Sequence, residues 1–242
     1  MLKPSPLALR FAGSLRDCRS GVAFLEFAFA LPVVLALGLL GLETANYAMS
    51  NLRVSNIAML TADNAARVRE SIDEGDIVEL MTGAKMSGSN INFAQNGRII
   101  LTDLERHSTA NLQWVRWQRC DGALNHTATP AALRPMTSGG TVISNGTEIY
   151  NSDRFTASSN PSSEAKASLT QVGSGSNVIS AAAGTAVMVV EVAYNYQPVI
   201  PNSFLTGRRI TYVSAFNVRQ RTDQTLRNIN RITPKSCNTF AA

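Results

Sequence analysis

An uncharged apolar run near the start of the chain constrains the fold more than any other feature. From Phe27 to Leu42 the sequence reads FAFALPVVLALGLLGL, and extension back to Val22 gives about 21 residues interrupted only by Glu26. A helix of roughly 20 mostly apolar residues crosses the hydrocarbon core of a bilayer. Because the run is apolar on every face, it is atypical of a helix on a soluble core. The sequence therefore predicts a transmembrane helix over residues 22–43.

Basic residues crowd only one end of this run. After it, the first basic residue is Arg53. The positive-inside rule places the N-terminus in the cytoplasm and the body in the periplasm, as a single-pass protein of a bacterial inner membrane. Outside the first 20 residues, 18 basic residues face 16 acidic ones, so the net charge of +5 and pI of 9.4 do not indicate a nucleic-acid partner. The basic residues before the run are Lys3, Arg10, Arg16 and Arg19.

An ordinary cleaved secretory signal is an alternative interpretation of the same run. Its only small-x-small triplet, Ala28-Phe29-Ala30, lies in the middle of the apolar stretch. Many apolar residues follow that triplet, and Glu26 precedes it, whereas a signal has its cleavage site after the apolar region. Both observations favour a retained membrane helix.

The junction between the leader and the run combines a glycine with a carboxylate. Gly21 closes the basic leader, and Glu26 follows five residues later, directly before Phe27. A carboxylate in hydrocarbon is costly, so it is a functional residue by default and needs a partner. The alternative is an interfacial glutamate whose side chain reaches the headgroups. The position of Glu26 alone leaves both alternatives open.

This arrangement of a Gly, four residues, a Glu and an aromatic residue resembles the type IV prepilin leader. The resemblance implies that a membrane prepilin peptidase cuts between Gly21 and Val22, which puts Glu26 at mature position five. The new amine on Val22 of one subunit would then pair with Glu26 of a neighbour and set the register of packed helices.

Residues 21–69 resemble more specifically the TadE/TadG-like proteins of tight-adherence (Flp, type IVc) pilus systems. The resemblance implies a minor pilin or pseudopilin that takes part in pilus assembly through its N-terminal helix, with no enzymatic activity and no cofactor. Its partners would be the prepilin peptidase, other pilin or pseudopilin subunits, the assembly platform and membrane lipid. The matching segments are Glu26-Phe27-Ala28, Leu31-Pro32, Glu43, Arg116 to Cys120 and Val190 to Pro198.

Helical periodicity continues beyond the membrane span to about Ser71. An apolar seam at steps of seven or of three to four predicts a continuous helix, whose extension over residues 44–75 supports the body. We expect this seam to pack on the body of the same chain, with a free face for a partner helix as the alternative. Pro32 removes one backbone hydrogen bond and is a candidate kink. The seam consists of Leu42, Met49, Leu52, Met59 and Ala66.

Beyond Gly75 the pattern predicts strands, and the class is α+β. In four segments, apolar and polar residues alternate or apolar residues follow one another without interruption. We therefore expect a roughly four-stranded antiparallel sheet packed on the long helix. These strands are expected at residues 98–102, 112–117, 186–197 and 209–219. The predicted organisation is a basic cytoplasmic leader at 1–21, a membrane helix at 22–43, its extension at 44–75, and a periplasmic domain at 76–242 with a loop-rich insertion at 121–185.

The cysteines and histidines are the candidates for a disulfide, a metal site or a catalytic site. Cys120 and Cys237 both fall on the oxidising side, which favours one disulfide over two free thiols, whereas Cys18 lies in the leader. His107 and His126 have no neighbouring ligand cluster, so we expect exposed loop residues and neither a catalytic nor a metal site. An uncleaved, membrane-anchored periplasmic binding or sensor module remains the alternative function.

Overall fold

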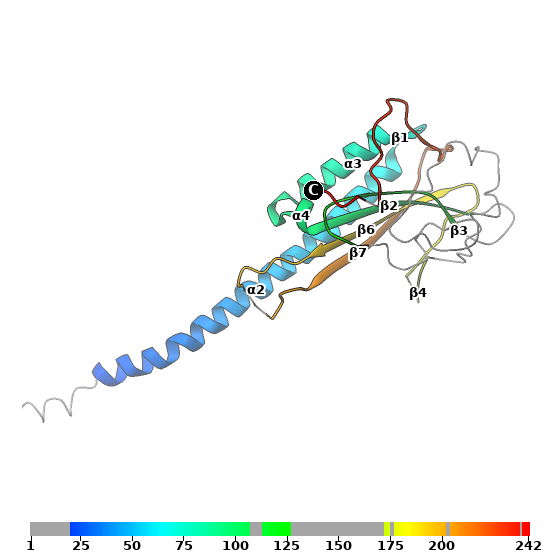
Figure 1. Cartoon of the computed structure of the whole chain (residues 1–242). Coiled ribbons are helices and arrows are strands. Elements are labelled where there is room, and N and C mark those ends of the chain that lie inside the picture. The colour runs from blue at the N-terminus through cyan, green and yellow to red at the C-terminus, as the bar shows by residue number, and fades with distance from the viewer. Residues whose placement is uncertain (1–19, 107–112, 127–171, 175–176, 202–203, 238) are drawn as a thin grey trace, which may run out of the picture.

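The computed structural model has the α+β class that the sequence predicts, with one long helix beside a four-stranded antiparallel sheet (Figure 1). Residues 1–19 of the leader and 127–171 of the insertion lie outside the part of the chain that the structure describes. The described residues are 20–106, 113–126, 172–174, 177–201, 204–237 and 239–242.

The long helix α2 (Ser20–Arg67) contains 48 residues and is about 72 Å long at 1.5 Å per residue. In Figure 1 its first half projects from the body and its second half lies against the sheet. One rod therefore contains both the predicted membrane span and the support of the body.

An arginine from a distant part of the chain, Arg221, caps the C-terminal end of α2. The Arg221 guanidinium donates to the carbonyl oxygens of Ala65 and Val68 at 3.4 and 3.3 Å. Cations next to the last carbonyls of a helix stabilise it, because those groups have no partner within the helix. Glu70 then takes a left-handed conformation with φ 59°, so the helix ends before Ser71.

The prediction that the apolar seam of α2 packs on the body is wrong for its large residues and holds only for Ala66, which is buried. Met49, Leu52 and Met59 are exposed by 52, 66 and 44%, and they lie on the outer face. The buried face carries mainly alanines, together with Val54 and Ile57, and it packs against β6 and β7, where Met188 and Tyr194 are buried. The alanines of that face are Ala58, Ala62, Ala65 and Ala66.

The four-stranded sheet has the order β3-β2-β6-β7, and every neighbouring pair is antiparallel. Each strand overlaps one predicted from the sequence. At the centre of the register, Ile100 of β2 lies opposite Cys120 of β3 on one side and Glu191 of β6 on the other. The strands are β2 (Gly97–Arg106), β3 (Gln113–Asp121), β6 (Ala186–Asn195) and β7 (Arg209–Asn217).

The two central strands are buried on both faces. Leu101 and Val190 share one buried cluster with α2, while Ile100 and Val189 belong to a second cluster on the opposite face. Both faces exclude water, so apolar residues follow one another in β6 (AVMVVEVAYN) with only Glu191 between them, whereas β2 also buries Arg98, Thr102 and Asp103. The edge strand β7 is more exposed: Thr211, Tyr212 and Val213 in its first half are all exposed, while Ile210 is buried.

A second helix, α3 (Glu74–Ser87), lies between α2 and the first predicted strand, in a segment for which the sequence predicted no separate helix. Asp73 caps it: its carboxylate accepts from the backbone N–H of Gly75 at 2.9 Å, and Asp76 accepts from the backbone N–H of Asp73 at 2.8 Å. Ile77 and Met81 are fully buried against the core. The remaining short elements are β1 (Ile72–Asp73), η1 (Ser89–Ile91), α4 (Phe93–Asn96), β4 (Val172–Ser174), β5 (Asn177–Ile179) and β8 (Leu226–Arg227).

Candidate functional site

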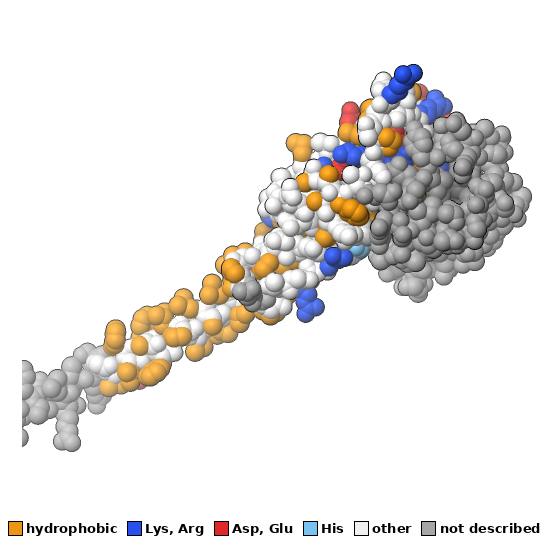
Figure 2. Space-filling view, in the orientation of Figure 1, with side chains coloured by type: hydrophobic (Ala, Val, Ile, Leu, Met, Phe, Trp, Pro, Cys, Tyr) orange, Lys and Arg blue, Asp and Glu red, His pale blue; other side chains and the backbone are white. Residues whose placement is uncertain are grey.

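The projecting half of α2 is exposed and apolar. Its most apolar window has a mean hydropathy of 2.3, and none of that window is buried in the structure. Figure 2 shows hydrophobic side chains along this part of the helix. By length and composition, α2 can cross a membrane. Its exposed large side chains include Val22, Phe24, Phe27, Phe29, Val34 and Leu37.

The peptide bond between Gly21 and Val22, the predicted cleavage site, lies in the first turn of α2. A Cβ added at Gly21 would meet no atom within 4 Å, and Val22 is 57% exposed. The first backbone N–H groups of a helix have no partner within it, so this turn unwinds at lower cost than the middle of the helix. Among the described residues, nothing obstructs access to this bond.

Glu26 and Phe27 are both exposed on α2. Glu26 lies one turn after Val22, so both residues are on the same face of the helix. None of the residues that the structure describes makes a hydrogen bond or an ion pair with this carboxylate. A partner for Glu26 therefore has to come from outside the described part of the chain.

Pro32 lies inside α2, and the helix continues on both sides of it. The backbone hydrogen bond that proline cannot donate is therefore lost without ending the helix. The bend predicted at Pro32 stays a prediction.

Glu43 marks the point where α2 enters the body, and its side chain is completely buried. One carboxylate oxygen accepts from the Tyr196 hydroxyl at 3.0 Å, and the other accepts from the backbone N–H groups of Val199 and Ile200 at 3.0 and 3.1 Å. A buried carboxylate needs such donors, because an unpaired charge is costly in a low dielectric. Glu43 thereby fastens the connection between β6 and β7 to the helix.

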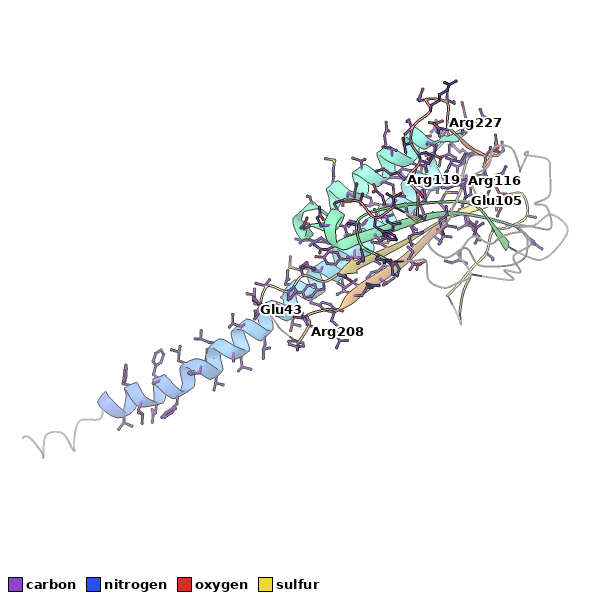
Figure 3. All side chains as sticks on the ribbon, viewed as in Figure 1. Glu43, Glu105, Arg116, Arg119, Arg208 and Arg227 are labelled. Atoms are coloured by element: carbon purple, nitrogen blue, oxygen red, sulfur yellow. A yellow bond between two sulfur atoms is a disulfide. The ribbon has the colours of Figure 1, made fainter. Side chains whose placement is uncertain are left out.

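The described residues of that connection, 196–201 and 204–208, are called the proximal loop below. Two further contacts fix its first residue: the Asn46 amide donates to the Tyr196 hydroxyl at 2.7 Å, and the rings of Tyr47 and Tyr196 meet edge to face at 5.0 Å. The loop closes on itself where the Tyr196 N–H donates to the Arg208 carbonyl at 2.9 Å. Glu43 and Arg208 lie at the same end of the body in Figure 3.

A buried ion pair joins α3 to the sheet. The Arg119 Nε atom of β3 donates to both carboxylate oxygens of Glu74, at 3.0 and 3.1 Å, and both side chains have no exposed surface. Glu74 begins α3, so its negative charge also lies at the favourable end of the helix dipole. The pair fixes the position of α3 over the edge of the sheet.

The C-terminal tail is held by a covalent and a polar contact. The Sγ atoms of Cys120 and Cys237 lie 2.01 Å apart, which is a disulfide bond between the predicted partners. Arg98 donates to the carbonyl oxygens of Cys237 and Thr239, and its guanidinium lies 4.3 Å from the centre of the Phe240 ring. Burial lowers the pKa of the Arg98 guanidinium to about 10, while Asp121 opposes this shift.

The prediction that His126 is an exposed loop residue is wrong; His107 lies outside the described residues. The His126 side chain is only 8% exposed, and its Nε2 atom lies 2.7 Å from a carboxylate oxygen of Glu191 on β6. Glu191 is separated from His126 by 65 positions, so the local sequence around the histidine carries no sign of this contact.

Asp103 on β2 is completely buried, and neither of its carboxylate oxygens has a hydrogen-bond partner among the described residues. Burial raises the pKa of the Asp103 carboxyl well above its usual range, and Glu105 adds to this shift, while Arg221 and Arg116 oppose it. The raised pKa means that folding favours the protonated carboxyl. The stability that this proton provides is present in acid and is lost as the pH rises through the folded-state pKa.

We therefore expect Asp103→Asn to stabilise the protein at pH 8. The expected gain in the free energy of unfolding is about 1.4 kcal/mol for each unit by which the pKa of the Asp103 carboxyl is higher in the folded than in the unfolded state. Only the part of this pKa difference that lies below the pH of measurement counts. The two proteins should converge below about pH 4, where the unfolded carboxyl is also protonated. Urea unfolding of the full chain in detergent between pH 4 and pH 8 measures this difference. A variant less stable than the wild type at pH 8 would contradict the expectation.

A groove between α2 and α3 is a second surface feature of the body. Leu60 of α2 and Leu80 of α3 give it apolar walls, and Asp76 and Glu79 give it an acidic side. Within the described residues, no group of three or more His, Cys, Asp or Glu side chains could hold a metal ion. The groove is thus lined by both apolar and acidic side chains.

Comparison of the chain with protein-family models, with curated proteins and with solved structures finds no match. The class of this protein is therefore defined by its architecture: a long apolar helix, capable of crossing a membrane, that continues into an α+β body with a four-stranded antiparallel sheet.

Proposed function

We propose that this chain is a minor pilin or pseudopilin of a tight-adherence pilus system, processed between Gly21 and Val22 and anchored in a bacterial inner membrane by α2. The observation that carries the proposal is the projecting half of α2, which is exposed, is apolar apart from Glu26, and continues into the half that packs against the sheet. A helix of this kind can pack with others like it while its body remains outside the membrane.

The residues at the start of α2 support this assignment. Val22 and Glu26 lie one turn apart on an exposed face, and the described residues leave the Glu26 carboxylate without a partner. After cleavage, the new amine on Val22 of a neighbouring subunit supplies an opposite charge at the same depth. In a low dielectric this pairing is strong enough to select one register of the packed helices.

A prediction on Glu26 tests the role in assembly. Glu26→Gln keeps the size and the hydrogen-bonding capacity of the side chain but removes its charge. We expect incorporation into sheared surface fibres, or cross-linking to other pilin-like helices, to fall at least about tenfold, since an unpaired buried charge costs several kcal/mol. The amount of chain in the membrane fraction should not change.

Glu70→Gln is the matched control for this experiment, because Glu70 is an exposed carboxylate on the body outside the groove between α2 and α3. It should leave incorporation unchanged. Normal incorporation of Glu26→Gln would count against pairing through this carboxylate and against the proposed function.

The groove between α2 and α3 favours a second candidate function, an uncleaved membrane-anchored binding module. Its apolar walls and its acidic side fit a ligand or a peptide that combines apolar and basic groups. This function requires the leader to stay on the chain, whereas the pilin function requires its removal. The N-terminal residue of the mature protein therefore separates the two.

A further inference from the structure

The proximal loop is the part of the body that lies nearest to the projecting half of α2, as Figure 1 shows. Its position is fixed, because the backbone N–H groups of Val199 and Ile200 and the hydroxyl of Tyr196 all donate to Glu43. Glu43 follows directly after the uncharged apolar run that ends at Leu42. The loop is therefore tied to α2 at one end of the predicted membrane span.

The loop exposes large apolar side chains. Val199 is 56% exposed and Phe204 is 61% exposed, whereas Leu205, next to Phe204, is buried in the core. Single exposed apolar residues are normal on a protein surface. Here two of them lie on one short loop, and Glu43 holds that loop at the end of an apolar helix.

The charges next to these apolar side chains have one sign. Arg208 and Arg209 are exposed at the end of the loop, and the sequence from Asn195 to Ile210 contains no Asp or Glu. Figure 3 shows Arg208 and Glu43 at the same end of the body, and the Glu43 carboxylate is buried and bonded to donors of the loop, so it is not part of this exposed surface. The loop thus presents an apolar and basic surface.

The length of the apolar run places this surface relative to a bilayer. Residues 22–42 rise by about 31 Å, which matches a hydrocarbon core of about 30 Å. When this run spans the core, Glu43 lies at the outer interface, and the loop bound to it lies at the level of the headgroups. Aromatic residues are enriched at that level, and basic side chains are attracted there by anionic lipids.

We propose that the proximal loop is a second membrane-contact site, which binds anionic phospholipid in the leaflet next to the body. Phe204 and Val199 enter the interfacial layer, and Arg208 and Arg209 contact lipid phosphate groups. The proposal rests on the proposed anchoring of α2 in a membrane. Attachment at two points, the helix and the loop, would set the angle at which the body stands on the bilayer.

Spin-label accessibility tests this contact with the full chain in lipid nanodiscs that hold one copy each. Thr206→Cys places a nitroxide on an exposed position of the loop without removing the proposed contact residues. Ile229→Cys is the reference label, at a 71% exposed position outside the loop. Cys18→Ser removes the free thiol from both variants. We expect the label at Thr206 to be at least threefold less accessible to a water-soluble relaxation agent than the label at Ile229, in discs with one quarter phosphatidylglycerol.

A third label at Leu35→Cys separates failure of the loop contact from failure of the anchoring. Equal accessibility at Thr206 and Ile229, with Leu35 protected, overturns the lipid contact and leaves the anchoring intact. A Leu35 label accessible to water overturns the anchoring, and the loop contact with it. Protection at Thr206 should weaken in discs of phosphatidylcholine alone, and also in Arg208→Gln with Arg209→Gln. Protection unchanged in both would overturn the role of anionic lipid.

Discussion

Glu74→Gln is expected to destabilise the body by about 3–5 kcal/mol, because it removes the carboxylate charge that pairs with the buried Arg119 guanidinium. Both side chains lack exposed surface, so water cannot replace the lost carboxylate. The loss is measured as the decrease in the free energy of unfolding of the full chain, from guanidinium denaturation in detergent at neutral pH.

Two variants control this prediction. Glu79→Gln removes an exposed carboxylate from the same helix and should change the free energy of unfolding by less than about 0.5 kcal/mol. Glu74→Met combined with Arg119→Met removes both charges and should recover most of the loss, since an apolar pair of similar size replaces a buried ion pair at little cost. A loss below 1 kcal/mol for Glu74→Gln alone would show that the pair does not hold α3 on the sheet.

Removal of the disulfide is expected to cost a similar amount. Cys120 and Cys237 close a loop with a sequence separation of 117, for which the loss of chain entropy in the unfolded state corresponds to about 4–5 kcal/mol. Replacement of both residues by Ala should lower the free energy of unfolding by about 3–5 kcal/mol. Denaturation under non-reducing conditions measures this decrease in the free energy of unfolding. Cys18→Ser is the control, and its free energy of unfolding should match that of the wild type.

Arg98 provides a further test of how the tail is held. Its guanidinium donates to the carbonyls of Cys237 and Thr239 independently of the disulfide. In the variant without Cys120 and Cys237, the tail should therefore remain protected from protease until Arg98→Met is added. Cleavage of the tail as soon as the disulfide is removed would show that the polar contacts alone do not keep it in place.

The strands were predictable from the sequence because their apolar patterns reflect local burial. Ala186–Asn195 is apolar apart from Glu191 and Asn195, since β6 is buried on both faces. Arg209–Asn217 was predicted from its alternation, but the burial of β7 does not alternate, because Thr211, Tyr212 and Val213 are all exposed. The helix α3 was missed although its signals are present. Asp73 and Asp76 form a capping box, and Ile77, Met81 and Ala84 recur at helical spacing, but Gly75 and Gly83 interrupt the pattern.

The buried face of α2 was assigned incorrectly because large apolar residues were given more weight than small ones. Met49, Leu52 and Met59 are hydrophobic, yet the helix approaches the sheet through Ala58 and Ala62. Which face of a helix is buried depends on the shape of the surface opposite, and the sequence of the helix does not contain that shape. The three outward side chains remain available to a partner helix.

The contacts of Glu43 could not be predicted from the sequence. Glu43 is recognisable as an acidic residue after the apolar run, but its donors Tyr196, Val199 and Ile200 are at least 153 positions away. No local pattern indicates such contacts. The same holds for His126 and Glu191, which meet only after the sheet has formed.

The identity of the first residue of the chain in native membranes tests the central claim most directly. N-terminal sequencing of the protein extracted from envelopes should begin at Val22 when an active prepilin peptidase is present, and at Met1 when the peptidase gene is deleted. Gly21→Leu should block the cut, and Gly38→Leu, at an equally unobstructed glycine inside α2, should not. An intact Met1 in the presence of the active peptidase would contradict the pilin assignment.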